Sequence, residues 1–273
     1  MRNLARFPRW LGALAFAAVV LSAAPSRADF VQITITNNQA AGGFAVTPFW
    51  LGLHNGSFTT FTPGSAANAA IQTVAETGDT GPLTTSFIGK GVQTTLTNAG
   101  IPFLPGSTAT TVLNVTDPTT TRYLSYASMV VPSNDLFLGN ANPLAIPLFD
   151  ASGKFLGPRT ITLTGGNVWD AGTEVNNIAD HPAFIQGVSD QGGARENGVV
   201  GTFLDRADSL NYLSSIVGKT TAANYAITQA FGRNDTIATI SISLVPEPST
   251  FALCGVGLAG LFTAARARSR RSA

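Results

Sequence analysis

Near both ends of its central region, the chain alternates apolar and polar side chains with a period of two residues. The apolar positions are Val31, Ile33 and Ile35 near the start, and Ile240, Ile242 and Leu244 near the end. Successive side chains of a β-strand point to opposite faces, whereas a helix repeats about every 3.6 residues. Both segments are therefore predicted to be strands with one buried and one solvated face, as in an antiparallel sheet.

Further strand candidates lie between clusters of Gly, Pro, Asn and Asp, which form turns. They span residues 44–54, 84–90, 109–116, 122–131, 146–149, 159–164 and 223–231. The central region is rich in Thr, Ser, Gly, Val and Ile and poor in Lys and Glu, which is typical of all-β secreted proteins. Roughly seven to nine short strands over this length predict an all-β fold, an antiparallel β-sandwich. We expect one domain over residues 29–244.

Two segments depart from the strand pattern. Residues 65–76 combine helix-forming residues with an apolar face, and Gly78 follows as a stop signal. They predict one short helix that lies across the sandwich. Residues 165–201 show little periodicity and contain many Gly, Asn and Asp. Long irregular loops in compact domains are often functional, so we expect binding there.

Residues 1–28 have the features of a secretory signal peptide. Three arginines precede an apolar run over residues 10–24. Small residues at Ser26 and Ala28 suit cleavage before Asp29. The chain is therefore predicted to be exported.

The C-terminal residues 245–273 are predicted to be a second targeting segment. Pro246-Glu247-Pro248 precedes an apolar run over residues 251–265, and four arginines follow. Such a span is held in a membrane as a transmembrane helix with its arginines on the cytoplasmic side. The apolar run of about fifteen residues is shorter than the roughly twenty that cross a bilayer comfortably, so an ordinary buried helix is the alternative.

The order of Pro-Glu-Pro, apolar span and arginines resembles the PEP-CTERM sorting signal of Gram-negative bacteria. This resemblance implies export across the inner membrane and transient anchoring by the C-terminal helix. It also implies cutting by a membrane protease of the exosortase type. The mature protein is then expected at the cell surface or outside the cell.

Without the two end segments, the chain is acidic. The whole sequence has 16 Lys and Arg against 15 Asp and Glu, and four arginines lie in each end segment. Eight basic and fifteen acidic residues therefore remain between residues 29 and 250, a net charge of −7. Such a surface repels nucleic acids and suits cations. The only cysteine, Cys254, lies in the C-terminal segment, which excludes a disulfide in the central region.

Several common kinds of site are excluded. The two histidines, His54 and His181, have no zinc-ligand spacing, and we expect structural roles for both. No Gly-x-Ser-x-Gly elbow is present, and the Gly-Lys-Gly at residues 89–91 lacks the rest of a phosphate-binding loop. Nucleophilic hydrolase and nucleotide-binding functions are therefore not indicated.

Three blocks of sequence resemble the spondin domain of animal F-spondin and mindin. The first runs from Thr47 through Asp79, and the third is Val-Trp-Asp-Ala-Gly-Thr-Glu at residues 168–174. The second is the most specific: it covers residues 123–139 and contains Val-Val-Pro-Ser-Asn-Asp-Leu. The resemblance spans about residues 30–205. It implies a β-sandwich of the membrane-targeting C2 type with one bound calcium ion.

Carried over position by position, the resemblance implies that Asp135, Asp170 and Glu174 bind the calcium ion. Glu174 departs from the family, which usually has Asp there, and its extra methylene moves the carboxylate by about one bond length. The residues alone also suit calcium, because two carboxylates at positions i and i+4 around Gly172 can turn toward one point. The alternative is a plain turn in which Asp170 caps backbone N–H groups.

Three functions remain open. The leading one is a non-enzymatic, calcium-binding spondin-type module that acts in cell-surface adhesion or in the extracellular polysaccharide matrix. The second is a lectin-like carbohydrate binder, with Trp50 or Trp169 as a stacking platform. The third is a secreted polysaccharide hydrolase that uses two carboxylates. Its candidate acids are Asp205 with Asp208, Asp180 with Asp190, or Glu196.

Overall fold

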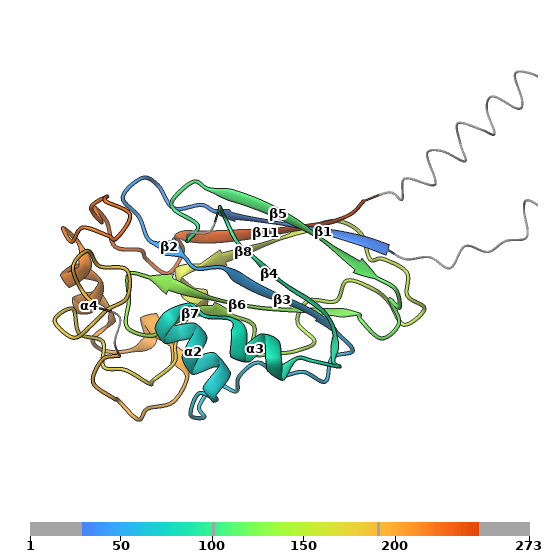
Figure 1. The fold of residues 1–273 in the computed structure, drawn as a ribbon, viewed down its shortest axis with the longest axis horizontal. Coiled ribbons are helices and arrows are strands. Elements are labelled where there is room, and N and C mark those ends of the chain that lie inside the picture. Colours follow the sequence, from blue (N-terminus) through green and yellow to red (C-terminus); the bar gives the residue numbers. More distant parts are fainter. Residues whose placement is uncertain (1–28, 100–101, 190–191, 246–273) are drawn as a thin grey trace, which may run out of the picture.

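Two antiparallel β-sheets packed face to face build the protein (Figure 1). The computed structural model describes residues 29–99, 102–189 and 192–245. The smaller sheet has the order β5 (Thr108–Val115), β1 (Asp29–Asn37), β11 (Thr236–Val245) and β8 (Arg159–Thr164). The larger sheet has the order β10 (Gly201–Thr202), β9 (Val168–Asp170), β7 (Leu136–Gly139), β6 (Tyr123–Val131), β3 (Phe49–His54) and β4 (Gly91–Leu96). The short β2 (Ala45–Val46) pairs with β6.

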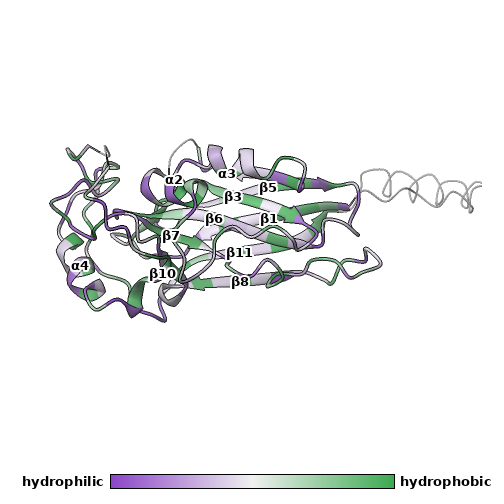
Figure 2. Cartoon of the chain, turned by 90° about the horizontal axis from the view of Figure 1, so that it is seen from below, coloured by the Kyte–Doolittle hydropathy of each residue, from purple (hydrophilic) through white to green (hydrophobic). Residues whose placement is uncertain are grey.

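The two alternating segments form neighbouring strands, as predicted. β1 pairs with β11 antiparallel, so that Ile33 faces Ile242 and Ile35 faces Ile240. Val31, Ile33 and Ile35 are completely buried, while the polar residues between them are half-buried. Because the smaller sheet has one dry and one wet face, its sequence carries the period of two. Figure 2 shows the apolar residues recurring along the strands of both sheets.

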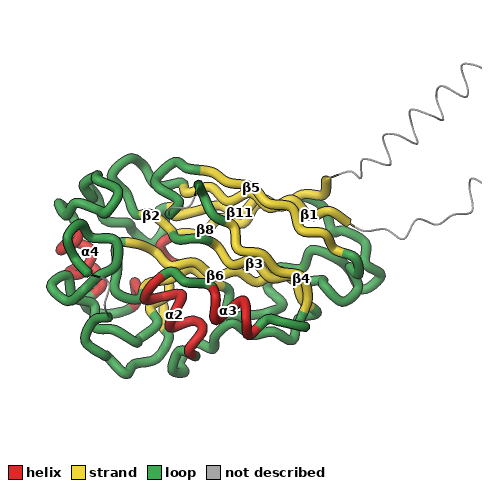
Figure 3. Tube along the Cα trace, in the orientation of Figure 1, coloured by secondary structure: helices red, strands yellow, loops and turns green. Residues whose placement is uncertain are grey.

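The larger sheet is covered on both faces, which explains why β3 and β6 lack a wet side. Between the sheets lies the main core, with residues such as Phe49, Leu51 and Leu124. On the outer face, a second cluster of buried residues contains Trp50, Phe87 and Phe137. Two helices, α2 (Ala69–Thr77) and α3 (Gly81–Ser86), lie over this face (Figure 3).

The predicted helix over residues 65–76 is present as α2, but it starts later. Asn68 is its N-cap, because the Asn68 Oδ1 accepts the Ile71 N–H at 3.0 Å. Gly78 ends it with φ +72, as the stop signal indicated. The expectation of one short helix was wrong, because the described residues also contain α3 and α4 (Ser209–Ile216). Two short 3₁₀ helices, η1 (Gly165–Asn167) and η2 (Phe203–Asp205), complete the elements.

Three predicted strands are wrong. Residues 84–90 end α3 and form a turn, and the strand β4 begins only at Gly91. Pro82, in the first turn of α3, favours a helix start there. Residues 146–149 make only isolated bridges, since Pro147 lacks the N–H that a ladder needs. Residues 223–231 form loops, with Asn224 in the left-handed region at φ +61.

The two ends of the described chain leave from the same end of the sandwich. β1 begins and β11 ends there, where Phe30 pairs with Val245. β7 begins and β9 ends at the opposite end, next to α4 (Figure 1). The predicted signal peptide and the predicted transmembrane helix lie outside the described residues. Within the described ranges, no helix is long and apolar enough to cross a membrane.

Candidate functional site

The pairing of β7 with β9 brings two of the predicted site residues together. Asp135 directly precedes β7, and Asp170 is the last residue of β9. The strands run antiparallel with Leu136 opposite Asp170, so both aspartates lie at the same end of the sheet. The Ala171 N–H donates to the carbonyl oxygen of Asp135 at 3.2 Å. Both aspartate side chains are completely buried.

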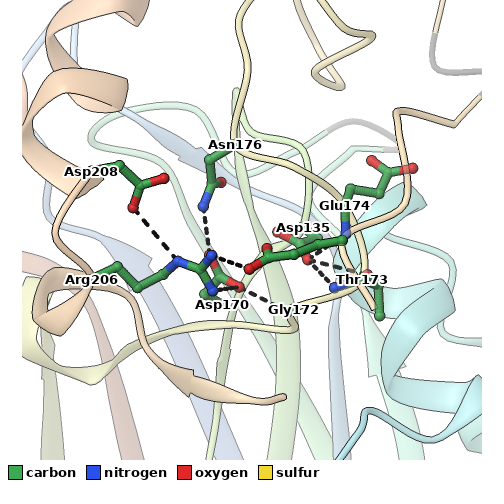
Figure 4. A network of polar contacts seen from close by, with 9 residues as sticks. Asp135, Asp170, Gly172, Thr173, Glu174, Asn176, Arg206 and Asp208 are labelled. Carbon is green, nitrogen blue, oxygen red and sulfur yellow. Dashed lines mark hydrogen bonds and ion pairs between the residues drawn. The ribbon is translucent and has the colours of Figure 1, made fainter. Parts of the chain in front are cut away.

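One carboxylate oxygen of Asp135 is satisfied and the other is not. Its Oδ2 accepts the Thr173 N–H at 2.7 Å, the Thr173 hydroxyl at 3.1 Å and the Glu174 N–H at 3.1 Å. Its Oδ1 is buried without a hydrogen-bond partner. Burial, and secondarily the nearby charge of Asp170, raise the pKa of Asp135 to about 8. Asp135 therefore lies beside a second buried carboxylate with one of its own oxygens unpaired (Figure 4).

Asp170 has partners on both oxygens. Its Oδ1 accepts the Gly172 N–H at 2.8 Å and lies 3.1 Å from Arg206 Nη1. Its Oδ2 accepts the Asn176 amide at 2.6 Å. Desolvation nevertheless raises the pKa of Asp170, although Asn176 and Arg206 act in the opposite direction. Asp170 thus caps a turn, as the alternative interpretation stated, while its carboxylate also faces the interior of the site.

Glycine at position 172 is required by the backbone of the loop. Gly172 adopts φ +66, and a Cβ at this position would lie 2.6 Å from the Val199 nitrogen. The Gly198 N–H donates to the Gly172 carbonyl at 2.7 Å, which locks the 170–174 loop against residues 198–199. Only a residue without a side chain permits both the left-handed turn and this close approach.

The structure does not bring Glu174 to the aspartate pair. The Glu174 side chain points away from Asp135 and Asp170 in Figure 4, and its Oε1 accepts the Gly193 N–H at 2.6 Å. Burial raises the pKa of Glu174, and the charges that act on it are those of Glu76, Arg195 and Asp180. Across residues 29–99, 102–189 and 192–245, no three His, Cys, Asp or Glu side chains are grouped as around a metal ion.

The site also contains residues that sequence reasoning missed. Arg206, just before α4, forms ion pairs with Asp170, with Glu196 and, at 3.7 Å, with Asp208. Asn176 Oδ1 and Glu196 Oε2 are, like Asp135 Oδ1, buried without a partner. No motif marks Asn176 or Arg206, because the residues around them show no periodicity and Arg206 reaches the site only through tertiary packing.

A turn held by side chains positions Asp135. The Ser133 hydroxyl donates to the Val130 carbonyl at 2.5 Å and accepts the Leu136 N–H at 3.2 Å. Tyr212 of α4 donates its hydroxyl to Asn134 Oδ1 at 2.6 Å and accepts the Asn134 N–H at 3.0 Å. The turn is therefore tied to β6 on one side and to α4 on the other.

The residues named for a lectin-like site are engaged elsewhere. Trp50 is completely buried, and its indole N–H donates to Gln93 at 2.8 Å, so it has no face for a sugar. Trp169 is half-buried; its N–H donates to the Gly139 carbonyl at 3.0 Å, and its ring packs edge-on against Phe61. Trp50 therefore forms no open platform, and the N–H and one ring contact of Trp169 are engaged within the protein.

Those residues named for a hydrolase that the structure describes are each held by an ion pair or a hydrogen bond. Asp205 is exposed and forms an ion pair with Arg233. Asp208 and Glu196 both pair with Arg206. Asp180 Oδ2 accepts the Ala194 N–H at 2.6 Å, and its proposed partner Asp190 lies outside the described residues.

Of the two histidines, His54 has the structural role that was predicted. It is completely buried, its Nδ1 accepts the Gly56 N–H at 2.9 Å, and its Nε2 lies 2.9 Å from the Ser125 hydroxyl. Burial lowers the pKa of His54 to about 4. His181 lies in a loop and its Nδ1 is 2.8 Å from the Ser189 carbonyl.

Comparison with known families identifies the C-terminal segment. Residues 244–271 match the PEP-CTERM protein-sorting motif. This motif implies an exported, cell-surface protein of a Gram-negative bacterium that is processed by an exosortase. Among curated proteins, no match to the chain was found.

The central region matches the model of the Spondin_N family over residues 47–186. The match includes Asp135, Asp170 and Glu174, and it ends before Arg206. The family is non-catalytic, and no enzyme family matches the chain. Because the matched range covers just over half of the 273 residues, the chain belongs to the Spondin_N family.

Proposed function

We propose that this protein is an exported, non-enzymatic calcium-binding module with a β-sandwich of the C2 type. The observation that carries the proposal is the buried Oδ1 of Asp135, which has no partner and lies beside a second buried carboxylate, that of Asp170. A buried carboxylate without a compensating charge is costly, so such pairs usually coordinate a cation or take up a proton.

The donor atoms at the site suit calcium. Calcium prefers six to eight oxygen ligands from carboxylates, carbonyls and water. Asp135 and Asp170 supply carboxylate oxygens, and the amide oxygen of Asn176 is buried and free. A bound ion would supply the positive charge that the aspartate pair lacks. It would also tie the start of β7 to the loop that follows β9 and so rigidify this end of the sandwich.

Glu174 is the third proposed ligand, and it requires a rearrangement. Its carboxylate now accepts the Gly193 N–H, so it would have to release that group before it could turn toward Asp135. The extra methylene of Glu174, where relatives usually have Asp, is consistent with its hydrogen bond to the Gly193 N–H. Calcium bound by Asp135, Asp170, Asn176 and water, without Glu174, is the arrangement that requires the least change in the structure.

The placement of the site supports a role at the cell surface. The PEP-CTERM motif begins at residue 244, and β11 ends at Val245, beside the start of β1. Asp135 and Asp170 lie where β7 begins and β9 ends, at the opposite end of the sandwich. A protein held through its C-terminal segment would thus present the calcium site away from the membrane. We propose that this end contacts a surface ligand in adhesion or in the extracellular polysaccharide matrix.

Calcium-dependent thermal stability tests the proposal. The melting temperature of the full chain is measured in chelator and in millimolar CaCl₂, for the wild type, Asp135→Asn and Asp205→Asn. Calcium at a hundred times its Kd stabilises a folded protein by about 2.7 kcal/mol, which predicts a rise of roughly 5–10 °C. Asp135→Asn should abolish the rise. Asp205→Asn is the matched control, because Asp205 is an exposed aspartate outside the site. A melting temperature that calcium does not change in the wild type would refute the proposal.

A further inference from the structure

Arg206 contacts more carboxylates than any other cation near the buried site. Its guanidinium donates to Asp170 Oδ1 at 3.1 Å and to Glu196 Oε1, and it lies 3.7 Å from Asp208. The neighbouring arginines have other partners: Arg195 pairs with Glu76, and Arg233 pairs with Asp205. In the part of the chain that the structure describes, Arg206 is therefore the cation that pairs with the buried Asp170, and it leaves Asp135 without a positive partner.

The position of Arg206 conflicts with a metal ion at the same carboxylates. A guanidinium donates to the lone pairs of carboxylate oxygens, and a calcium ion coordinates the same lone pairs. Asp170 Oδ1 already accepts the Gly172 N–H as well as Arg206, so it has no free lone pair. Calcium can thus bind through this oxygen only if Arg206 withdraws.

The structure also contains a second partner toward which Arg206 can withdraw. Asp208 follows Arg206 by two residues, and its side chain is 55% exposed. The Asp208 carboxylate approaches Nε, whereas Asp170 and Glu196 are bound by the terminal nitrogens. Asp208 accordingly offers a solvated ion pair that does not require the buried oxygens.

We propose that Arg206 is a built-in cation that competes with calcium for the Oδ1 oxygen of Asp170. This inference rests on the proposed calcium site and deepens it. Without calcium, Arg206 partly neutralises the buried acids and keeps the 170–176 loop folded. With calcium, Arg206 releases them and pairs with Asp208. The protein would then bind calcium more weakly than its carboxylates alone allow, and it would respond only to high external concentrations.

Calcium titration of arginine variants tests the competition. The Kd for calcium alone is measured by isothermal titration calorimetry on the full chain, for the wild type, Arg206→Met and Arg233→Met. The two variants lose the same charge, but only Arg206 contacts the buried site. In Arg206→Met, calcium no longer has to break the charge-assisted hydrogen bond between Arg206 and Asp170. We therefore expect a Kd about tenfold to a hundredfold lower than in the wild type. Arg233→Met should stay within about twofold of the wild type.

Each outcome decides a different claim. If the wild type binds calcium and Arg206→Met binds it no more tightly than Arg233→Met, the competition is refuted while the calcium site stands. If neither the wild type nor Arg206→Met binds calcium, the proposed function itself fails. Should Arg206→Met not fold, Arg206→Lys decides, because a lysine keeps the charge but cannot bridge two carboxylates. It should lower the Kd several-fold, and an unchanged Kd would overturn the inference.

Discussion

Replacement of Asp135 by asparagine should stabilise the calcium-free protein and abolish its response to calcium. Asparagine keeps an oxygen in place of Oδ2, which can still accept the Thr173 and Glu174 N–H groups. Its amide replaces Oδ1, the buried oxygen without a partner beside the carboxylate of Asp170. The substitution thus replaces a carboxyl group that burial and Asp170 keep from ionising by a neutral amide, at little cost in hydrogen bonds.

The magnitude follows from the raised pKa of Asp135. Burial places this pKa at about 8, whereas an aspartate in the unfolded chain titrates near 3.8. At pH 7 Asp135 is therefore protonated in the folded protein but ionised in the unfolded chain. This difference lowers the free energy of unfolding by about 1.4 kcal/mol for each of roughly three pH units. Because surrounding groups relax around a buried charge, we expect about half of this sum, or about 2 kcal/mol.

Urea unfolding in chelator at pH 7 measures this gain. Asp135→Asn should unfold at higher urea than the wild type with an unchanged slope, and its melting temperature should rise by about 4–8 °C. Added calcium should shift the wild type but not the variant. Asp205→Asn, an exposed aspartate, should leave both values nearly unchanged. A calcium-free Asp135→Asn protein that is less stable than the wild type would refute the reasoning, since the carboxylate would then be favourable where it lies.

Three further changes test other parts of the structure. Gly172→Ala should lower stability by about 3 kcal/mol or more and weaken calcium binding, because its Cβ would collide with the Val199 backbone at φ +66; a smaller loss in urea unfolding would contradict the tight turn. Glu174→Asp should lose the hydrogen bond to Gly193, at about 1 kcal/mol, and bind calcium more tightly in calorimetry; unchanged binding would argue against position 174 as a ligand. His54 should make the protein acid-sensitive: its folded pKa of about 4 lies below the unfolded value of 6.5, so the unfolded chain binds more protons between these values. Stability should therefore fall as the pH drops from about 6.5 to 4, by about 1–2 kcal/mol, and a His54→Gln variant should lose less over the same range.

The one-sided strands β1 and β11 and also the covered strands β3 and β6 could be predicted from the sequence, whereas the very short strands could not. β1 and β11 alternate visibly because only their inner side chains are buried. β7 and β9 were missed as separate strands because four and three residues are too few to show a period. Residues 84–90 were mistaken for a strand because Thr, Phe and Ile favour strands, whereas the packing of α3 on the larger sheet overrides that preference.

The acidic residues of the candidate site could be named from the sequence only through the resemblance to the spondin domain. That resemblance led to Asp135 and Asp170, which the structure brings together, and to Glu174, which it turns toward Gly193. Arg206 and Asn176 could not be found in this way. Arg206 follows η2 and lies far from Asp170 in the sequence, and Asn176, only six residues after Asp170, belongs to no recognisable motif.

The C-terminal sorting motif, the strand character of both ends of the central region and the family could be recognised from the sequence. These properties depend on local patterns of charge, hydropathy and spacing, which are the same whatever conformation the chain adopts. Tertiary packing was needed to show which carboxylates share a buried site, at which end of the sandwich they lie and which cation pairs with Asp170. Those outcomes depend on the burial and proximity of residues far apart in the chain, and burial is what turns two ordinary aspartates into a site that requires positive charge.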